Sequence, residues 1–325
     1  MATPANTDYI QRSNVEARIP EDVSSEVIQS LPEASAALSL FPRVTLSSKV
    51  RRLPVLSLLP VAYWVDGDIG LKQTTRMAWD KKVIEAEEIA AIVPIPENVL
   101  DDEDFDVWAE VRPRLVEAIG AAVDEAIFFG VNAPASFPPD LLSGAVAAAN
   151  THELGSASAG AGGIAEDINQ LMALVEDEGF DVNGFVTHRG LKARLRGARD
   201  TTGQKLLDVS TDSIEGAPVR YAMSGLWPDD GSAEMFAGDF SQGILGIRRD
   251  ITYKMLDQAV IQDGDGTIVY NLPQQDMVAL RVTFRLGFQV ANPITRANPN
   301  TPNLTTGVPT AGQRYPFAVL TDETS

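Results

Sequence analysis

SSKVRRLPVLSLLPVAYWVDGDIGLKQTTRMAWDKKVIEAEEIAAIVPI, residues 47–95, is the stretch from which the fold of this chain can be worked out. Two apolar segments flank the sequence DGDIG at residues 66–70, whose glycines accept the positive φ angles of a tight turn. The stretch therefore predicts a long β-hairpin over residues 46–95. Pro54 and Pro60 cannot donate hydrogen bonds to a neighbouring strand, so they favour a projecting ribbon over the centre of a sheet.

A ribbon of two strands with so many apolar side chains is marginally stable and prone to aggregate unless it packs against something. The charge pattern suggests which surface the ribbon packs against. Residues 49–82 carry seven Lys or Arg against three Asp, a net charge of +4, whereas residues 85–110 carry ten Asp or Glu and no basic residue. Charge alone favours two solvated faces. Together with the apolar hairpin, it indicates a surface that docks onto copies of the same chain, because opposite patches steer association and fix register.

The composition excludes several classes of protein. The chain has 325 residues, of which 44% are hydrophobic, enough for about two domains with real cores. It contains no cysteine, which excludes disulfides, thiolate metal sites and cysteine nucleophiles. A formal charge of −19 argues against a dedicated nucleic-acid binder. We expect no signal peptide and no membrane contact, since neither the N-terminal residues nor any apolar run has the required pattern.

The sequence predicts a polar arm before the hairpin and a long helix after it. Residues 1–45 are polar and punctuated by proline, so we expect a mobile arm that a neighbouring subunit holds. After the hairpin, apolar residues at helical spacing predict one long helix over residues 104–129, with an acidic start at 101–106 and Gly130 as its end.

The rest of the chain predicts a mixed α/β domain and a returning strand. We expect a loop at 131–163 and an irregular tail at 296–325. Residues 277–290 alternate apolar and polar side chains almost without interruption, which predicts a strand. The remaining predicted elements are helices at 164–178 and 188–198 and strands at 184–187, 217–223, 233–238 and 243–256.

The sequence contains no combination of residues that indicates a catalytic site. The chain has only two histidines, His152 and His188, and lacks the G-x-S-x-G motif of a serine nucleophile. The sequence DGDGT at 263–267 imitates a calcium loop, but the twelfth position is Gln274, so we expect a tight turn. The basic residues of 189–199 favour a solvated or inter-subunit face over a phosphate site. We therefore expect no catalytic residue, cofactor or metal, and keep a metal-dependent hydrolase that uses the acidic run as a remote alternative.

The order of the predicted parts is arm, projecting hairpin, long helix, inserted α/β domain and return strand. It resembles the major capsid proteins of tailed double-stranded DNA phages, whose Hong Kong 97-like fold encapsulin shells share. Three segments resemble motifs of that family. They are FVTHRGLKARLRGARDTTGQKLL at 185–207, FAGDFSQGILGIRRDITYKM at 236–255 and MVALRVTFRLGFQVANP at 277–293.

The resemblance implies an α+β fold of this type with four regions. Residues 1–45 form the N-terminal arm, and residues 46–84 form the extended hairpin loop. Residues 85–164 and 270–325 form the peripheral domain, which holds the long helix, called the spine helix. Residues 165–269 form the axial domain, which points at the centre of each ring of subunits.

The resemblance also implies the function. We expect a structural major capsid protein, assembled in the host cytoplasm into pentamers and hexamers of an icosahedral head, that resides in the virion. It would enclose double-stranded DNA without sequence-specific binding, with scaffolding, portal and decoration proteins as further partners. The alternative that shares the fold is an encapsulin-type nanocompartment shell with protein cargo.

The expected subunit contacts combine both lines of reasoning. The basic hairpin of one subunit is expected to lie over the acidic start of a neighbour's spine helix, with apolar residues providing adhesion and charges setting register. The expected contact residues are Leu56, Leu58, Tyr63, Trp64, Lys72, Arg76, Trp79, Lys81 and Lys82 on the hairpin, and Asp101, Asp102, Glu103 and Asp104 on the neighbour.

Overall fold

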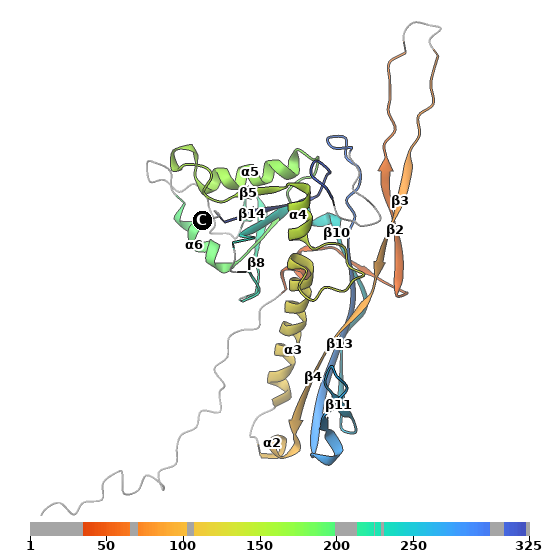
Figure 1. Ribbon diagram of the computed structural model, residues 1–325, viewed down its shortest axis with the longest axis vertical. Helices are drawn as coiled ribbons and strands as arrows, with labels where there is room; N and C mark the ends of the chain where they lie inside the picture. Colours follow the sequence, from red (N-terminus) through yellow and green to blue (C-terminus); the bar gives the residue numbers. More distant parts are fainter. Residues whose placement is uncertain are drawn as a thin grey trace, which may run out of the picture.

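The computed structural model describes residues 35–65, 71–102, 107–198, 213–223, 225–228, 231–299 and 309–322. They form a mixed α+β fold (Figure 1). The helices are α1 Ala36–Leu40, α2 Glu97–Asp102, α3 Val107–Asp124, α4 Leu141–Ala148, α5 Ile164–Glu176 and α6 Arg189–Gly197. The strands are β1 Arg43–Thr45, β2 Val50–Leu58, β3 Ala78–Glu85, β4 Glu87–Pro96, β5 Thr151–Glu153, β6 Gly184–Thr187, β7 Ser213–Ile214, β8 Ala217–Tyr221, β9 Met235–Gly238, β10 Gly243–Leu256, β11 Val260–Gln262, β12 Ile268–Asn271, β13 Met277–Val290 and β14 Phe317–Thr321.

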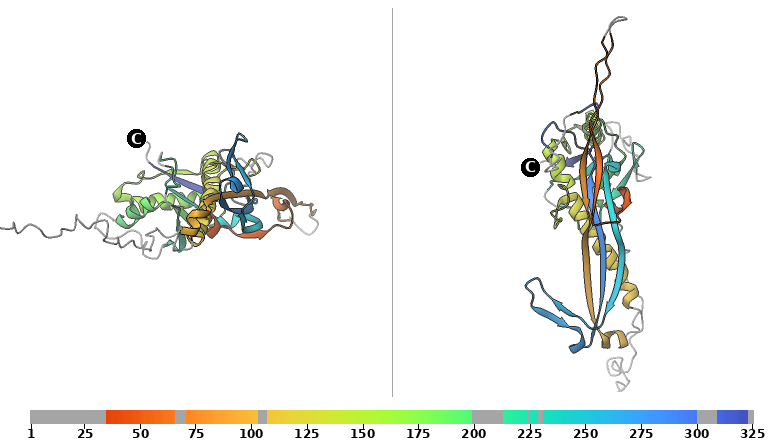
Figure 2. Two further views of the ribbon diagram at one scale, coloured as in Figure 1. Left: turned by 90° about the horizontal axis from the view of Figure 1, so that it is seen from below. Right: turned by 90° about the vertical axis from the view of Figure 1, so that its right-hand side faces the viewer.

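A long sheet in the order β1-β10-β13-β4 runs along the elongated part of the molecule (Figures 1 and 2). Strand β13 runs antiparallel to both β10 and β4, with Leu280 opposite Met255 on one side and Val93 on the other. Its bounds are those that the alternating sequence predicts. Leu280, Phe284 and Phe288 belong to the main apolar core, because the alternation places them on one side of the strand.

The spine helix lies against this sheet. Helix α3 begins at Val107 and continues through a π-helical turn, Glu125–Phe129, to Gly130, whose φ of 69° ends it. The predicted end of this helix is therefore confirmed, while its predicted start at 104 lies outside the described residues. Leu115, Ile119 and Val123 are buried on the side that joins the main core.

A second sheet, in the order β5-β14-β9-β6-β8-β7, forms the compact part of the molecule. Alternate side chains separate its two faces. Phe236 and Phe317 join the main core, whereas Met235 and Ala318 join a second core under α5 and α6. Strands β6 and β10 have the predicted bounds, and β8, β9, α5 and α6 are slightly shorter than predicted. In the described part of the chain, no helix has the length and apolar character needed to span a membrane.

Two predictions of irregular structure were wrong. The tail at 296–325 contributes β14, which lies between β5 and β9 inside the second sheet. The predicted loop at 131–163 contains α4 and β5. Strand β14 is only five residues long, Phe317–Thr321, and all but the last are buried, so its sequence FAVLT has no alternation to reveal it.

The predicted arm is also partly wrong. Residues 1–34 lie outside the described part, but the next residues pack on their own chain. Ala36, Ala37 and Phe41 belong to the main core. Asp124 of the spine helix accepts hydrogen bonds from the Ser35 hydroxyl at 2.6 Å and from the Ala36 and Ala37 amides at 2.9 and 3.0 Å. No neighbouring subunit is needed to hold this segment.

The prediction of one continuous hairpin over 46–95 was wrong for residues 86–95. Strand β3 pairs with β2, but the chain leaves the hairpin at Ala86, and β4 pairs with β13 in the long sheet. Two glycines make this crossing possible. Gly246 of β10 and Gly287 of β13 face each other, and Ile84 passes close to both.

Candidate assembly interface

The hairpin of β2 and β3 projects beyond both sheets (Figures 1 and 2). The two strands pair from Val50 opposite Glu85 to Leu58 opposite Ala78, with one irregularity near Leu56. Further out, the two sides are joined by side chains, since the Val61 amide donates to the Thr75 hydroxyl at 2.9 Å. The predicted turn at 66–70 lies outside the described residues.

Large apolar side chains are exposed along the outer part of this hairpin, from Trp79 of β3 outward. Trp64 is 101% exposed, Leu71 87% and Trp79 63%, and Tyr63 is exposed as well. Leu56 and Leu58 are half-buried, and the Ile294 amide donates to the Leu56 carbonyl at 3.1 Å, so this part of the stem rests on its own chain. Val61 and Leu71 are exposed although sequence reasoning did not single them out. The only signal in the sequence is that both are apolar residues within a few positions of the predicted turn at 66–70.

The basic residues of the hairpin have different surroundings. Lys72, Arg76 and Lys81 are exposed. Lys82 instead points at its own body, where its ammonium donates to the Val290 carbonyl at 2.7 Å. Burial and the nearby Arg314 guanidinium lower the pKa of Lys82 from 10.5 to about 8. The sequence had suggested Lys82 as a basic docking group. Because its ammonium is bonded to its own chain, Lys82 instead belongs to the stem of the hairpin.

This burial of Lys82 gives a testable dependence on pH. Between pH 8 and 10.5, the unfolded chain holds a proton that the folded chain has lost, so stability rises with pH across that window. We expect Lys82→Met to remove this rise. Such a lowering of the pKa means that burying the charged ammonium costs the folded chain about 3 kcal/mol. Replacing Lys82 by Met removes this cost but also removes a hydrogen bond that contributes about 1 kcal/mol. The free energy of unfolding at pH 7 should therefore increase by about 2 kcal/mol.

Denaturant unfolding of the two chains from pH 7 to 10 measures this difference. Lys81→Met is the matched control, because Lys81 is the exposed neighbour on the same strand. It should leave the profile unchanged. Parallel profiles for Lys82→Met and the unaltered chain would contradict the burial of this ammonium.

The expected acidic receptor is described only in part. Asp101 and Asp102 belong to α2, at the end of the molecule opposite the hairpin tip (Figure 1). Glu103 and Asp104 lie outside the described residues. Two residues of the acidic stretch 85–110 already form ion pairs within the chain. Glu85 pairs with Lys49 at 2.8 Å, and Glu88 pairs with Arg285.

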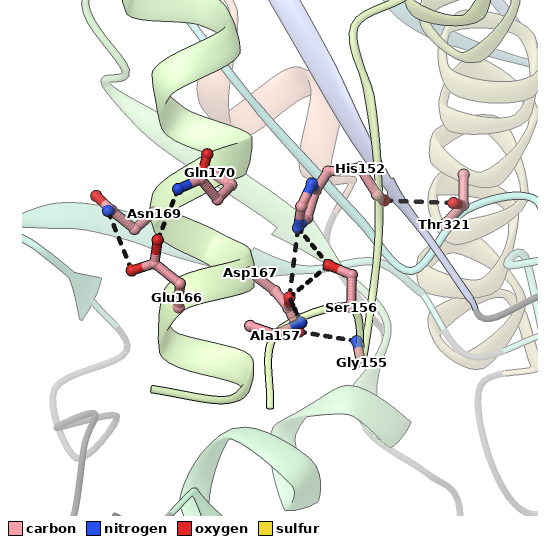
Figure 3. Close-up of polar contacts among 9 residues, drawn as sticks. All are labelled: His152, Gly155, Ser156, Ala157, Glu166, Asp167, Asn169, Gln170 and Thr321. Carbon is pink, nitrogen blue, oxygen red and sulfur yellow. Dashed lines mark hydrogen bonds and ion pairs between the residues drawn. The ribbon is translucent and has the colours of Figure 1, made fainter. Parts of the chain in front are cut away.

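One cluster contains the residue types of a serine hydrolase but not their arrangement (Figure 3). Ser156 Oγ lies 2.9 Å from His152 Nε2, and Asp167 Oδ1 lies 3.3 Å from the same nitrogen. A catalytic triad needs the acid and the serine on different ring nitrogens, so that the histidine can relay a proton. Asp167 instead orders the turn before α5, because it accepts the Gly155 and Ala157 amides at 2.8 and 2.9 Å.

The sequence DGDGT is the tight turn that was predicted. The Asp263 carboxylate accepts the amides of Asp265 and Thr267 at 3.1 and 2.9 Å, so it is occupied by the backbone of its own turn.

Comparison with known proteins identifies the family. The phage capsid family matches residues 17–295, most of the chain. The chain belongs to this family. The major capsid protein of Staphylococcus phage 80alpha is 26% identical over 276 residues, which cover 83% of this chain and 81% of that protein.

Solved structures agree with the fold. A structure from Microbacterium phage Oxtober96 has a TM-score of 0.81 at 38% identity and covers 97% of this chain and 100% of its own. One from Mycobacterium phage Bobi has a TM-score of 0.81 at 30% identity, with 98% and 100% covered. The predicted α+β fold of the Hong Kong 97-like type is confirmed.

The function follows from membership of the family. This phage capsid family member is a major capsid protein of a tailed phage, a structural subunit that assembles with its own copies and resides in the virion. The encapsulin alternative is not favoured, since the family and its curated relative are those of phage capsids.

Proposed function

We propose that this capsid protein forms pentamers and hexamers that close into an icosahedral head around double-stranded DNA. The observation that carries the proposal is the projecting hairpin, whose exposed aromatic and aliphatic side chains have no partner surface among the described residues of the same chain's cores. In a monomer these side chains would face water. Fully burying one large apolar side chain contributes about 2 to 3 kcal/mol before the costs of association are subtracted.

The proposed contact places the hairpin of one subunit on the peripheral part of the next. Its adhesive residues are Leu56, Leu58, Tyr63, Trp64 and Trp79, with Lys72, Arg76 and Lys81 as the basic residues. The acidic receptor remains Asp101, Asp102, Glu103 and Asp104 of the neighbour. The domain boundaries remain as proposed from the sequence, residues 46–84 for the extended loop and 165–269 for the axial domain, although β10, which lies within the second range, pairs with β13 in the long sheet.

The proposed role is structural, without catalysis. The DNA would be enclosed and not bound by sequence, which suits a chain of charge −19. Scaffolding, portal and decoration proteins would be the other partners, and assembly would take place in the host cytoplasm before the head joins the virion.

Electron microscopy of the purified full chain tests the proposal, with closed shells as the expected result. In a chain with Tyr63→Ser, Trp64→Ser and Leu71→Ser, we expect no shells, because the exposed apolar surface of the hairpin tip is removed. Thermal unfolding should be unchanged, since these side chains are exposed in the folded chain. Normal shells from this variant would overturn the docking scheme.

Val146→Ser is the matched control. Val146 lies on α4 and is 54% exposed, so this change also removes exposed apolar surface, but away from the hairpin. It should assemble as the unaltered chain does. If the unaltered chain itself stays monomeric at high concentration, the proposed assembly is wrong.

A further inference from the structure

A cavity of about 300 Å³ lies where the start of β4 meets the end of the spine helix and the loop that follows it. We call it the spine cavity. Its walls are mostly apolar and include Ile89 of β4, Val123 of the spine helix and Phe137 of the loop. Of the described residues that line it, three are glutamates and none is basic. The spine cavity therefore combines apolar walls with negative charge.

Small side chains keep this space open. Ala90 lines it from β4, and Ala122 and Ala126 line it one turn apart on the spine helix. A π-helical turn begins at Glu125, and such turns are rare and often accompany functional sites. Pockets that bind small organic molecules begin at about this volume. The spine cavity is therefore large enough for one large side chain but too small for a helix or a strand.

Two of the three glutamates already have partners. Glu87 accepts a hydrogen bond from the Ser136 hydroxyl at 3.0 Å, and Glu88 is paired with Arg285. Glu125 is half-buried, and its carboxylate has no partner among the described residues. The negative charge of the spine cavity thus comes mainly from Glu125 and Glu87, since a hydroxyl group does not neutralise a carboxylate.

The spine cavity is open to the surface and to a partner. Two of its lining residues, Ala90 and Val131, are exposed. The tip of the chain's own hairpin does not reach it, because the hairpin points away from the body (Figure 1). No residue of the hairpin is among the described residues that line the cavity. A hairpin that fills it must therefore come from another copy.

The tip of the hairpin carries a matching group. Trp64 is 101% exposed, more than any other large apolar side chain that the structure describes. Lys72 and Arg76, on the opposite arm of the hairpin, are exposed as well. A tryptophan accompanied by two cations complements an apolar cavity that carries carboxylates. Tryptophan is also among the side chains most often found as anchors in interface pockets.

We propose that Trp64 of one copy inserts its indole ring into the spine cavity of the next copy. The basic residues Lys72 and Arg76 then lie opposite Glu125. This inference rests on the proposed function, because it names the place where the hairpin docks. Strand β4 leads from the spine cavity to α2, so a hairpin that lies along this strand also reaches the proposed acidic receptor.

A binding experiment tests the insertion directly. The chain with Tyr63→Ser, Trp64→Ser and Leu71→Ser, which is expected to stay unassembled, is titrated with a synthetic peptide of residues 59–77, and calorimetry measures the affinity. We expect one peptide to bind per chain. The same peptide with Trp64→Ser should bind at least about tenfold more weakly, because it lacks the group that fills the cavity.

A second variant tests the cavity. Adding Ala122→Phe to the titrated chain places a phenyl group in the cavity, so the unaltered peptide should bind at least about tenfold more weakly. Ala118→Phe is the matched control, since Ala118 is exposed one turn earlier on the same helix and does not line the cavity. It should leave the affinity unchanged. Thermal unfolding of both chains verifies that they fold.

A charge exchange keeps the inference testable even if Ala122→Phe fails to fold. Glu125→Lys in the titrated chain should weaken binding of the unaltered peptide at least about threefold, because like charges then face each other. A peptide with Lys72→Glu and Arg76→Glu should bind this variant more tightly than the unaltered peptide does. The titrated chain that keeps Glu125 should prefer the unaltered peptide.

Peptide binding and shell formation separate this inference from the proposed function. If the unaltered chain forms shells and a chain with Ala122→Phe alone forms them at the same concentration, the spine cavity is not the docking site, while the assembly stands. If the peptide does not bind, or if neither Trp64→Ser nor Ala122→Phe weakens its binding, the inference is overturned. If the unaltered chain forms no shells, the proposed function is wrong, and the titration still decides whether the cavity takes the indole ring.

Discussion

Gly287→Ala is expected to destabilise the folded chain by about 3 kcal/mol, because a methyl group at this position has no room. A Cβ atom on Gly287 would lie 2.3 Å from the Glu85 carbonyl oxygen and 2.7 Å from Ile84 Cγ2. The nearer atom belongs to the backbone, so it cannot swing aside as a side chain would. The strand that leads from the hairpin into the long sheet would have to move.

Denaturant unfolding of the monomer measures this loss. Gly264→Ala is the matched control, since no atom lies within 4 Å of a Cβ built there. It should change the free energy of unfolding by no more than about 0.5 kcal/mol. If the two variants are equally stable, the close crossing of β3 over β13 is not present in the folded chain. The same change should also redirect the hairpin and impair assembly, because Glu85 is the last residue of β3.

Asp124→Ala is expected to have an effect of similar size, about 3 kcal/mol, because it leaves several buried donors without a partner. The carboxylate, which is 1% exposed, accepts the hydroxyl of Ser35 and the amides of Ala36 and Ala37. It is thus the attachment between the spine helix and the first described residues of the chain. Its loss should also make the segment around Ala36 accessible to proteases.

Asp140→Ala is the control for this change. Asp140 also caps a short helix, accepting the Ser143 amide at 2.9 Å, but this contact is exposed. Loss of such a cap typically costs about 1 kcal/mol. Unfolding and limited proteolysis of both variants test the difference. Equal losses, with no new cleavage near residue 36, would show that Asp124 acts as an ordinary cap and not as a buried attachment.

At the candidate interface, the sequence predicts some exposed residues correctly but cannot distinguish Lys81 from Lys82. Lys81 and Lys82 are adjacent and of the same type, so no pattern in the sequence separates them. On a β-strand they point in opposite directions, and only the pairing of β3 with β2 and its approach to Val290 decide which one turns inward. Tyr63 and Trp64 were predictable as exposed because they precede the turn that the sequence predicts at the end of a projecting ribbon.

The sequence by itself determined the elements that depend on neighbouring residues. The alternation of 277–290 predicts β13, the apolar spacing before Gly130 predicts the spine helix and its end, and the turn at 66–70 predicts a projecting hairpin. The order of these parts then indicates the fold. Only the tertiary structure decided that β4 leaves the hairpin, that β14 enters the second sheet, and that Asp124 holds Ser35 across 89 positions of the chain. Such contacts join residues that are distant in sequence, and their energy comes from burial and pairing that exist only after the chain has folded.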